Sequence, residues 1–310
     1  MNPTRRKFIH LSVLGGGVTW ACRRIWAAPE PKVSGTTSAF YQAAADQIRP
    51  LFEAKKPPQA GDWLANRKEP GQTFDQYLKT DPNRCTAERS KLYLQPIGDF
   101  TAMETSMVGK LKEFMQHFFG MEVVTLEKIG LEKVPNSARR DSPTSGKEQI
   151  LTRHILDNVL RPNRPKDAVA VLAITPSDLW PGEGWNFVFG QASLEERVGV
   201  WSTARFGDPN QDPARFLRRV LQVAVHETGH MLGIKHCTAY ECCMNGSNNL
   251  AESDRAPLFF CAECEPKIWW ACSIHPAARA NELAAMAKRF SMAAESSHWL
   301  RVAEIFGAGK

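Results

Sequence analysis

An amphipathic pattern between Asp212 and Gly233 is the most distinct structural signal in the chain. Its apolar side chains recur three and four residues apart and would form one buried stripe: Phe216, Leu217, Val220, Leu221 and Ala224. Asp212 is a suitable N-cap, Pro213 fits the first helical position, and Gly233 is a typical stop. The pattern therefore predicts a helix over residues 213–232.

Weaker patterns predict further elements on both sides of this helix. Apolar spacing favours helices near 38–54, over 106–119 before Gly120, and over 146–160 before Pro162. Strands are expected at 122–126, 168–174, 187–189 and 198–201, and one long helix should follow Pro276. Helices alternate with strands ahead of residue 213, which predicts an α+β or mixed α/β fold with a mixed sheet and helices packed on it.

Length and composition limit the broad class of the protein. With 310 residues, of which 43% are hydrophobic, the chain can bury one large core or two smaller lobes. The longest apolar runs, such as 168–174, are too short to cross a membrane. The net charge of +6 is modest and scattered, so nucleic-acid binding is not expected. We expect one monomeric domain over 29–310, with an upper lobe to about 233 and a lower lobe over 234–310.

The N-terminus resembles an export signal. The run Thr4-Arg5-Arg6-Lys7-Phe8-Ile9 precedes an uncharged stretch to Ala21, which is typical of a twin-arginine signal over residues 1–28. Cleavage after Ala27 fits this interpretation, Cys22 offers a poorer lipoprotein site, and a disordered basic tail is the structural alternative. Export would place the protein outside the cytoplasm; recovery of an intact N-terminus from the host cytoplasm would rule the signal out.

The end of the predicted helix carries the pattern of a catalytic metal site. His226 and His230 are four residues apart, so both imidazoles face one point on the same helical face. Gly233 can adopt a left-handed conformation and turn the chain, which lets His236 return as a third ligand. Three neutral nitrogens leave one coordination position of zinc open for water, and Glu227 lies beside it as a general base. Chance occurrence of such a string is far less probable than metal binding.

Cysteines crowd together directly after the third histidine. Of eight cysteines in the chain, five fall between residues 237 and 264, which are Cys237, Cys242, Cys243, Cys261 and Cys264. Their spacing predicts a second, structural zinc with four thiolate ligands, one of Cys242 and Cys243 being spare. Disulfides are the alternative if the protein is exported to an oxidising compartment.

Met244 follows His236 by eight residues and precedes an Asn-Gly turn signal. A methionine at this place can form an apolar floor under the histidines, although a single Met is more often ordinary core.

These residues together resemble one peptidase family. The string from His226 to Met244, followed by Cys261 and Cys264, is similar to the archaemetzincins, zinc metallopeptidases of the metzincin clan. Further similar segments lie between about Trp63 and Ile268: 71–78, 95–98, 178–181, 187–192, 197–200 and 244–248. The resemblance implies His226, His230 and His236 as ligands of a catalytic zinc, Glu227 as the base and Met244 as the Met-turn. It also implies Cys237, Cys242, Cys261 and Cys264 as ligands of a second zinc.

The resemblance further implies a two-lobed catalytic domain. A twisted mixed sheet would carry a backing helix and the active-site helix, with an edge strand in the region 187–200 that pairs with extended substrate. The smaller C-terminal lobe would hold the structural zinc. The predicted function is thus hydrolysis of peptide bonds in a peptide or protein substrate. Two alternatives remain: a catalytically weak, zinc-stabilised peptide- or protein-binding module, and a zinc-finger module built from the cysteines.

Overall fold

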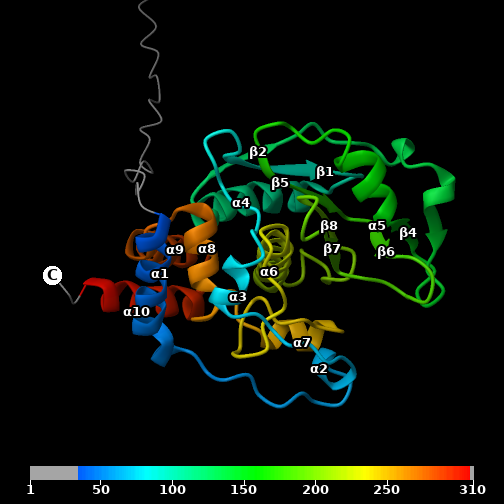
Figure 1. The fold of residues 1–310 in the computed structure, drawn as a ribbon. Coiled ribbons are helices and arrows are strands. Elements are labelled where there is room, and N and C mark those ends of the chain that lie inside the picture. The colour runs from blue at the N-terminus through cyan, green and yellow to red at the C-terminus, as the bar shows by residue number, and fades with distance from the viewer. Residues whose placement is uncertain (1–33, 308–310) are drawn as a thin grey trace, which may run out of the picture.

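A five-stranded mixed sheet is the centre of the protein. The computed structural model describes residues 34–307, so the predicted export signal at 1–28 lies outside the described residues. The strands are β1 (Lys91–Pro96), β2 (Glu122–Thr125), β5 (Ala168–Thr175), β7 (Gly190–Ala192) and β8 (Val198–Ser202), in the order β2-β1-β5-β8-β7. All neighbours are parallel except β7, which runs antiparallel to β8 at one edge (Figure 1). The predicted mixed sheet in a mixed α/β fold is confirmed.

Two hydrophobic clusters cover the two faces of this sheet. Alternate residues of β1 and β5 belong to different clusters: Leu92 and Leu172 face one side, whereas Tyr93 and Val171 face the other. The first face is covered by α4 (Ala102–Phe119) and α6 (Pro213–Met231), which also pack against each other. The second face is covered by α5 (Thr152–His154) and the π-helical segment η4 that continues it (Ile155–Leu160).

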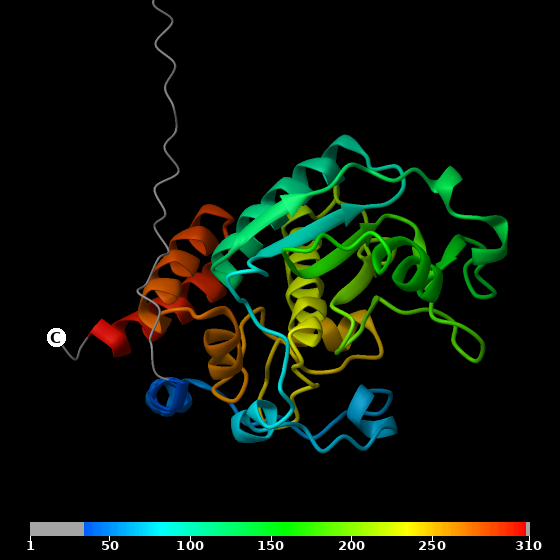
Figure 2. The same cartoon turned by 45° about the horizontal axis from the view of Figure 1, so that its top comes forward.

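The helix predicted over 213–232 is α6, and the cause of its position is local. The Asp212 side chain accepts a hydrogen bond from Arg215 N at 3.0 Å, and Pro213 occupies the first turn. Beyond the helix end, Gly233 adopts φ +84°, the left-handed conformation expected there. The last turns of α6 run beside β7 and β8 (Figure 2). The helix therefore brings its C-terminal residues to the open edge of the sheet.

Three sequence predictions are wrong at their boundaries. Residues 148–151 are not helical, because they form β4 (Glu148–Leu151) between β3 (Arg139–Asp141) and β6 (Asp178–Trp180) in a second sheet. The predicted strand at 187–189 lies three residues later, as β7. The long C-terminal helix is two helices, α9 (Pro276–Arg289) and α10 (Ala293–Gly307), because Ser291 adopts φ +60° and Met292 turns back into the core.

The other helices lie at the two ends and beneath the sheet. They are α1 (Ser34–Ile48), α2 (Trp63–Asn66), α3 (Phe74–Leu78), α7 (Leu250–Arg255) and α8 (Glu265–Cys272), with short 3-10 turns η1 (Arg49–Leu51), η2 (Leu131–Lys133) and η3 (Asn136–Ala138). In Figure 1, α1 and α8–α10 lie at the end of the molecule opposite β4 and α5. Among the described residues, no helix combines the length and apolar character needed to cross a bilayer.

Candidate metalloprotease active site

Three histidines converge where α6 ends. His226 and His230 come from its last two turns, and His236 comes from the loop that follows Gly233. Their ring centroids lie 4.6, 4.9 and 5.3 Å apart, and one ligand nitrogen from each ring lies within 4.8 Å of the other two. The structure therefore brings together the three residues that the sequence predicted as one site.

Hydrogen bonds fix which nitrogen of the His226 and His230 rings faces the centre of the three-histidine site. Nδ1 of His226 lies 2.8 Å from Cys243 O, and Nδ1 of His230 lies 2.7 Å from Ile234 O. A carbonyl oxygen can only accept, so Nδ1 carries the proton and Nε2 presents its lone pair. The two Nε2 atoms lie 3.1 Å apart. Lone pairs that converge so closely fit a bound cation, and three neutral imidazoles are a donor set that zinc prefers.

Burial keeps these rings in the form that binds metal. It lowers the pKa of His226 to about 4, with a further contribution from the nearby His236. Burial also lowers the pKa of His230 well below its ordinary value, and His226 and His236 add to this effect. Both rings are therefore uncharged near neutral pH.

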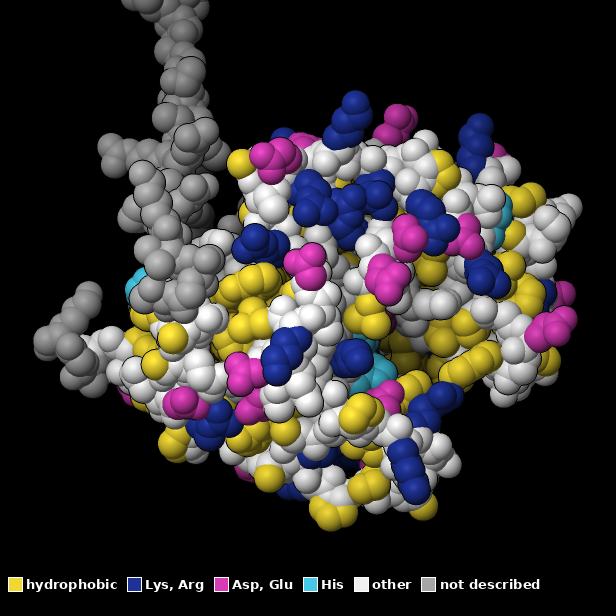
Figure 3. Space-filling model, viewed as in Figure 1, with side chains coloured by type: hydrophobic (Ala, Val, Ile, Leu, Met, Phe, Trp, Pro, Cys, Tyr) yellow, Lys and Arg dark blue, Asp and Glu magenta, His cyan; other side chains and the backbone are white. Residues whose placement is uncertain are grey.

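Glu227 points into the same cleft and has no hydrogen-bond partner within residues 34–307. It is buried, and burial raises the pKa of its carboxyl group to about 8. The cleft has a volume of about 530 Å³ and is lined by α6, the free side of β7 and the loop at 243–248. Figure 3 shows histidine side chains at the bottom of this hollow, with hydrophobic and charged side chains around it.

Gly190 on β7 makes room for the Glu227 carboxylate. A Cβ atom at Gly190 would lie 2.5 Å from Glu227 Oε1, so no larger residue fits there without moving the carboxylate. We expect Gly190→Ala to lower kcat/KM for peptide hydrolysis by about 10²-fold, because a displacement near 1 Å at a reacting group has this effect. Gly109→Ala on α4, where a Cβ meets nothing within 4 Å, is the control and should keep full activity. Equal activity of the two variants in a peptide-cleavage assay would contradict the role of Gly190.

The four cysteines chosen from the sequence form a second cluster. Cys237, Cys242, Cys261 and Cys264 are all buried, and their sulfur atoms lie within 4.8 Å of one another. They are free thiols, with 3.6 Å between the sulfur atoms of Cys237 and Cys261. Cys242 Sγ accepts backbone hydrogen bonds from Met244 N at 3.4 Å and Cys261 N at 3.3 Å, which suits a thiolate. Cys243 instead points toward Gln222 O, 3.5 Å away.

The four thiols of the cluster affect one another's pKa values because they are buried together. Hydrogen bonds from Cys242, Cys261 and Cys264 lower the pKa of Cys237. Burial, together with hydrogen bonds to the other thiols, raises the pKa of Cys242. Four buried sulfur atoms that lie this close together are a typical ligand set for a structural zinc.

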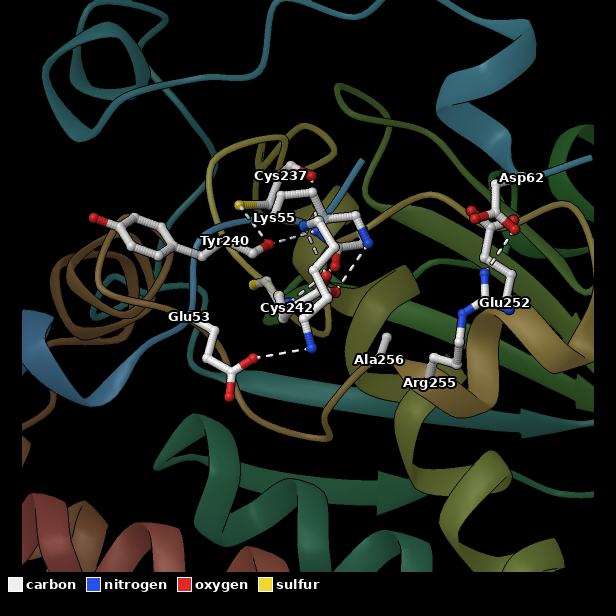
Figure 4. Close-up of polar contacts among 12 residues, drawn as sticks. Glu53, Lys55, Asp62, Cys237, Tyr240, Cys242, Glu252, Arg255 and Ala256 are labelled. Carbon is white, nitrogen blue, oxygen red and sulfur yellow. Dashed lines mark hydrogen bonds and ion pairs between the residues drawn. The ribbon is translucent and has the colours of Figure 1, made fainter. Parts of the chain in front are cut away.

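Met244 and Asn245 link the two clusters. Met244 is fully buried, and its sulfur lies 2.6 Å from where a Cβ atom at Gly229 would stand, so it packs directly under the turn between His226 and His230. Asn245 Nδ2 donates to Cys237 O and Tyr240 O, while its Oδ1 accepts from Cys242 N at 3.0 Å. Figure 4 shows Tyr240, Cys237 and Cys242 around this point. Loop 237–245 is therefore shared by both candidate sites.

Comparison with known proteins places this arrangement in a family. The model of peptidase family M54 matches residues 89–269. The chain belongs to peptidase family M54. Archaemetzincin-2 of Rattus norvegicus is 33% identical over 252 residues, which covers 70% of each chain. Archaemetzincin-2 of Homo sapiens is 32% identical over 263 residues, or 74% of this chain and 71% of that one.

A solved archaemetzincin structure has the same fold as this chain. The crystal structure of archaemetzincin from Methanopyrus kandleri is 32% identical, covers 61% of this chain and 98% of that one, and gives a TM-score of 0.51. The resemblance to archaemetzincins is confirmed, and so is the prediction of a zinc-dependent metallopeptidase.

Three residues of the M54 site were not predicted as functional from the sequence: Glu69, Gly190 and Asn245. Glu69 contacts His236, with both carboxylate oxygens 3.0 Å from Nδ1. The only available signals were indirect, since Glu69 lies two residues before the 71–78 segment and the other two residues lie inside similar segments.

Proposed function

We propose that this M54 peptidase hydrolyses peptide bonds at the three-histidine site, with Glu227 as general base and a second, structural zinc at the four cysteines. The observation that carries the proposal is the convergence of three Nε2 lone pairs beside a buried carboxylate in an open cleft. His226, His230 and His236 would hold the catalytic ion, which polarises the scissile carbonyl and makes water acidic when bound.

The chain's own groups account for the remaining steps. The free side of β7 lines the cleft, and an extended peptide can pair with such an edge through its backbone. Glu227 would take a proton from the attacking water and deliver it to the leaving amine nitrogen. Within residues 34–307 this carboxyl group has no hydrogen-bond partner, which leaves it available to water and to the amine. A cation held by the histidines would favour its ionised, proton-accepting form.

The geometry favours the enzyme over a binding module that retains the metal sites. A module of that kind needs the ligands but not Glu227, whose buried carboxylate requires a glycine at position 190 on the facing strand. A zinc-finger function would use the cysteine cluster alone and leaves the histidine site unexplained.

Metal counting tests the proposal directly. Purified protein is expected to contain two zinc ions per chain by mass spectrometry under native conditions. Mild chelation should remove one ion together with peptidase activity on a peptide library, because that site has an open coordination position and lies in the cleft. The second ion should stay until the fold is lost. A fully active protein with no zinc at the histidines would contradict the assignment.

Other features of the sequence remain proposals. We propose export through the twin-arginine signal at 1–28, a single metzincin-like domain over 29–310 with lobes divided near 233, and a monomeric state. The arginine pair and the following uncharged stretch support export. N-terminal sequencing of protein from outside the cytoplasm tests the signal, and light scattering tests the oligomeric state.

A further inference from the structure

The segment from Asp62 to Thr73 lies outside the family match at 89–269, yet it reaches the histidine site. One end of this segment is attached to α7. Arg255 donates to Asp62 Oδ1 at 2.6 Å, and Trp63 N donates to the Glu252 carboxylate at 2.9 and 3.0 Å. Figure 4 shows Asp62, Glu252 and Arg255 together at this attachment.

The other end of the segment is attached to the loop that carries His236. The Gln72 side chain donates to Gly233 O at 3.3 Å and accepts from Lys235 N at 3.2 Å, as a paired strand would. Lys267, which is buried, donates to the carbonyl oxygen of Gln72. Gly71 adopts φ +68°, and a Cβ atom there would lie 2.4 Å from Thr238 Oγ1, so the contact requires glycine.

Between these attachments, Glu69 and Trp63 enclose His236. The two Glu69 oxygens lie 3.0 Å from His236 Nδ1, and both side chains are largely buried, at 26% and 19% exposure. The Trp63 ring meets the imidazole edge to face at a centroid distance of 5.2 Å. Each ring of the other two histidines is held by a backbone carbonyl, whereas His236 is held by a side chain 167 residues away.

From this geometry we infer that Glu69 is a positioning residue for the third histidine. Its carboxylate accepts the Nδ1 proton of His236 and so turns Nε2 toward His226 and His230. A carboxylate at this place also makes the imidazole a stronger donor to a metal. The inference rests on the proposed function of the three histidines as ligands.

Substitution of Glu69 tests the inference through metal affinity. Competition with a chromophoric chelator should show zinc bound at the histidine site 10- to 100-fold more weakly in Glu69→Ala, about the effect of losing such a partner. Glu69→Gln keeps an acceptor oxygen without charge and should recover part of the affinity. Lys68→Ala, at the exposed neighbouring residue, is the control and should bind as the parent does. The zinc at the cysteines should be unchanged in all three variants.

A second measurement is independent of metal at the histidines. Long-range ¹H–¹⁵N NMR spectra of protein stripped by mild chelation should show His236 protonated at Nδ1 in the parent and a mixture of tautomers in Glu69→Ala. Parental zinc affinity in Glu69→Ala, or a parent His236 without the Nδ1 proton, would overturn the inference. Failure of the parent to bind zinc at the histidines would overturn the proposed function instead, and the NMR result would still decide the Glu69 contact.

Discussion

Glu227→Gln is expected to lower kcat for peptide hydrolysis by about 10²- to 10⁴-fold while both zinc ions stay bound. The amide has the shape of the carboxyl group but cannot accept a proton from water. Glu227 makes no hydrogen bond or ion pair within residues 34–307, and it packs over Gly190 by its size alone, so the fold should tolerate the neutral side chain. KM should change little, because the carboxylate acts in the reaction rather than in binding the peptide backbone.

The measurement is a peptide-cleavage assay alongside zinc analysis of the same preparation. Glu183→Gln makes the same chemical change at an exposed carboxylate in the loop beside the cleft, and it should leave kcat at the parental value. Loss of activity together with loss of zinc would show damage to the site rather than to the base. A zinc-loaded Glu227→Gln enzyme with parental kcat would remove Glu227 from the mechanism.

The parts of the site that the sequence predicted are those with local causes. Asp212, Pro213 and the apolar stripe define α6, and the helical period then places His226 and His230 on one face. Gly233 needs only its own left-handed conformation to return the chain toward the site. For the cysteines, spacing indicated a metal cluster but did not decide between Cys242 and Cys243 as its fourth ligand. Only the fold shows that the Cys242 sulfur faces the cluster while Cys243 faces Gln222.

The wrong predictions share a non-local cause. Residues 146–151 have helical spacing, but Gln149 is fully buried, and its side chain donates to Asp178 and to Asn186 O. These hydrogen bonds accompany the parallel pairing of β4 with β6. Strand pairing here outweighs the local preference for a helix. The break between α9 and α10 has no glycine or proline, so its origin is the burial of Met292 against the core.

The contact of Glu69 with His236 could not be predicted from the sequence. A glutamate two residues before a similar segment has no distinctive pattern, and its partner lies 167 positions further along the chain. Its place depends on contacts that Asp62 makes with α7 and that Gln72 and Gly71 make with the loop carrying His236. Candidate metal ligands can be recognised from their spacing, whereas the residues that contact and orient them depend on how distant segments pack.

Cys242→Ser is expected to remove the second zinc and to lower the unfolding temperature on the order of 10 °C or more. A serine hydroxyl does not replace a zinc thiolate, and three buried sulfurs would remain without their fourth partner. Structural zinc contributes about 10–16 kcal/mol of apparent binding free energy in small zinc peptides, whereas a whole domain is stable by only about 5–15 kcal/mol. Loss of the ion should therefore destabilise the loop 237–245 and, through its link to His236, the catalytic site.

Cys243→Ser is the matched control for this prediction, one residue further along the same loop. The Cys243 sulfur lies 3.5 Å from Gln222 O, and a serine hydroxyl can donate to that carbonyl, so its cost should stay within about 2 kcal/mol. The His226 contact uses the backbone oxygen of Cys243 and is unchanged by the substitution. Zinc analysis and thermal unfolding by circular dichroism should give one ion and a large shift for Cys242→Ser, but two ions and a small shift for Cys243→Ser. The reverse order would make Cys243 the ligand, and two ions in both variants would mean that the cluster does not hold zinc through either residue.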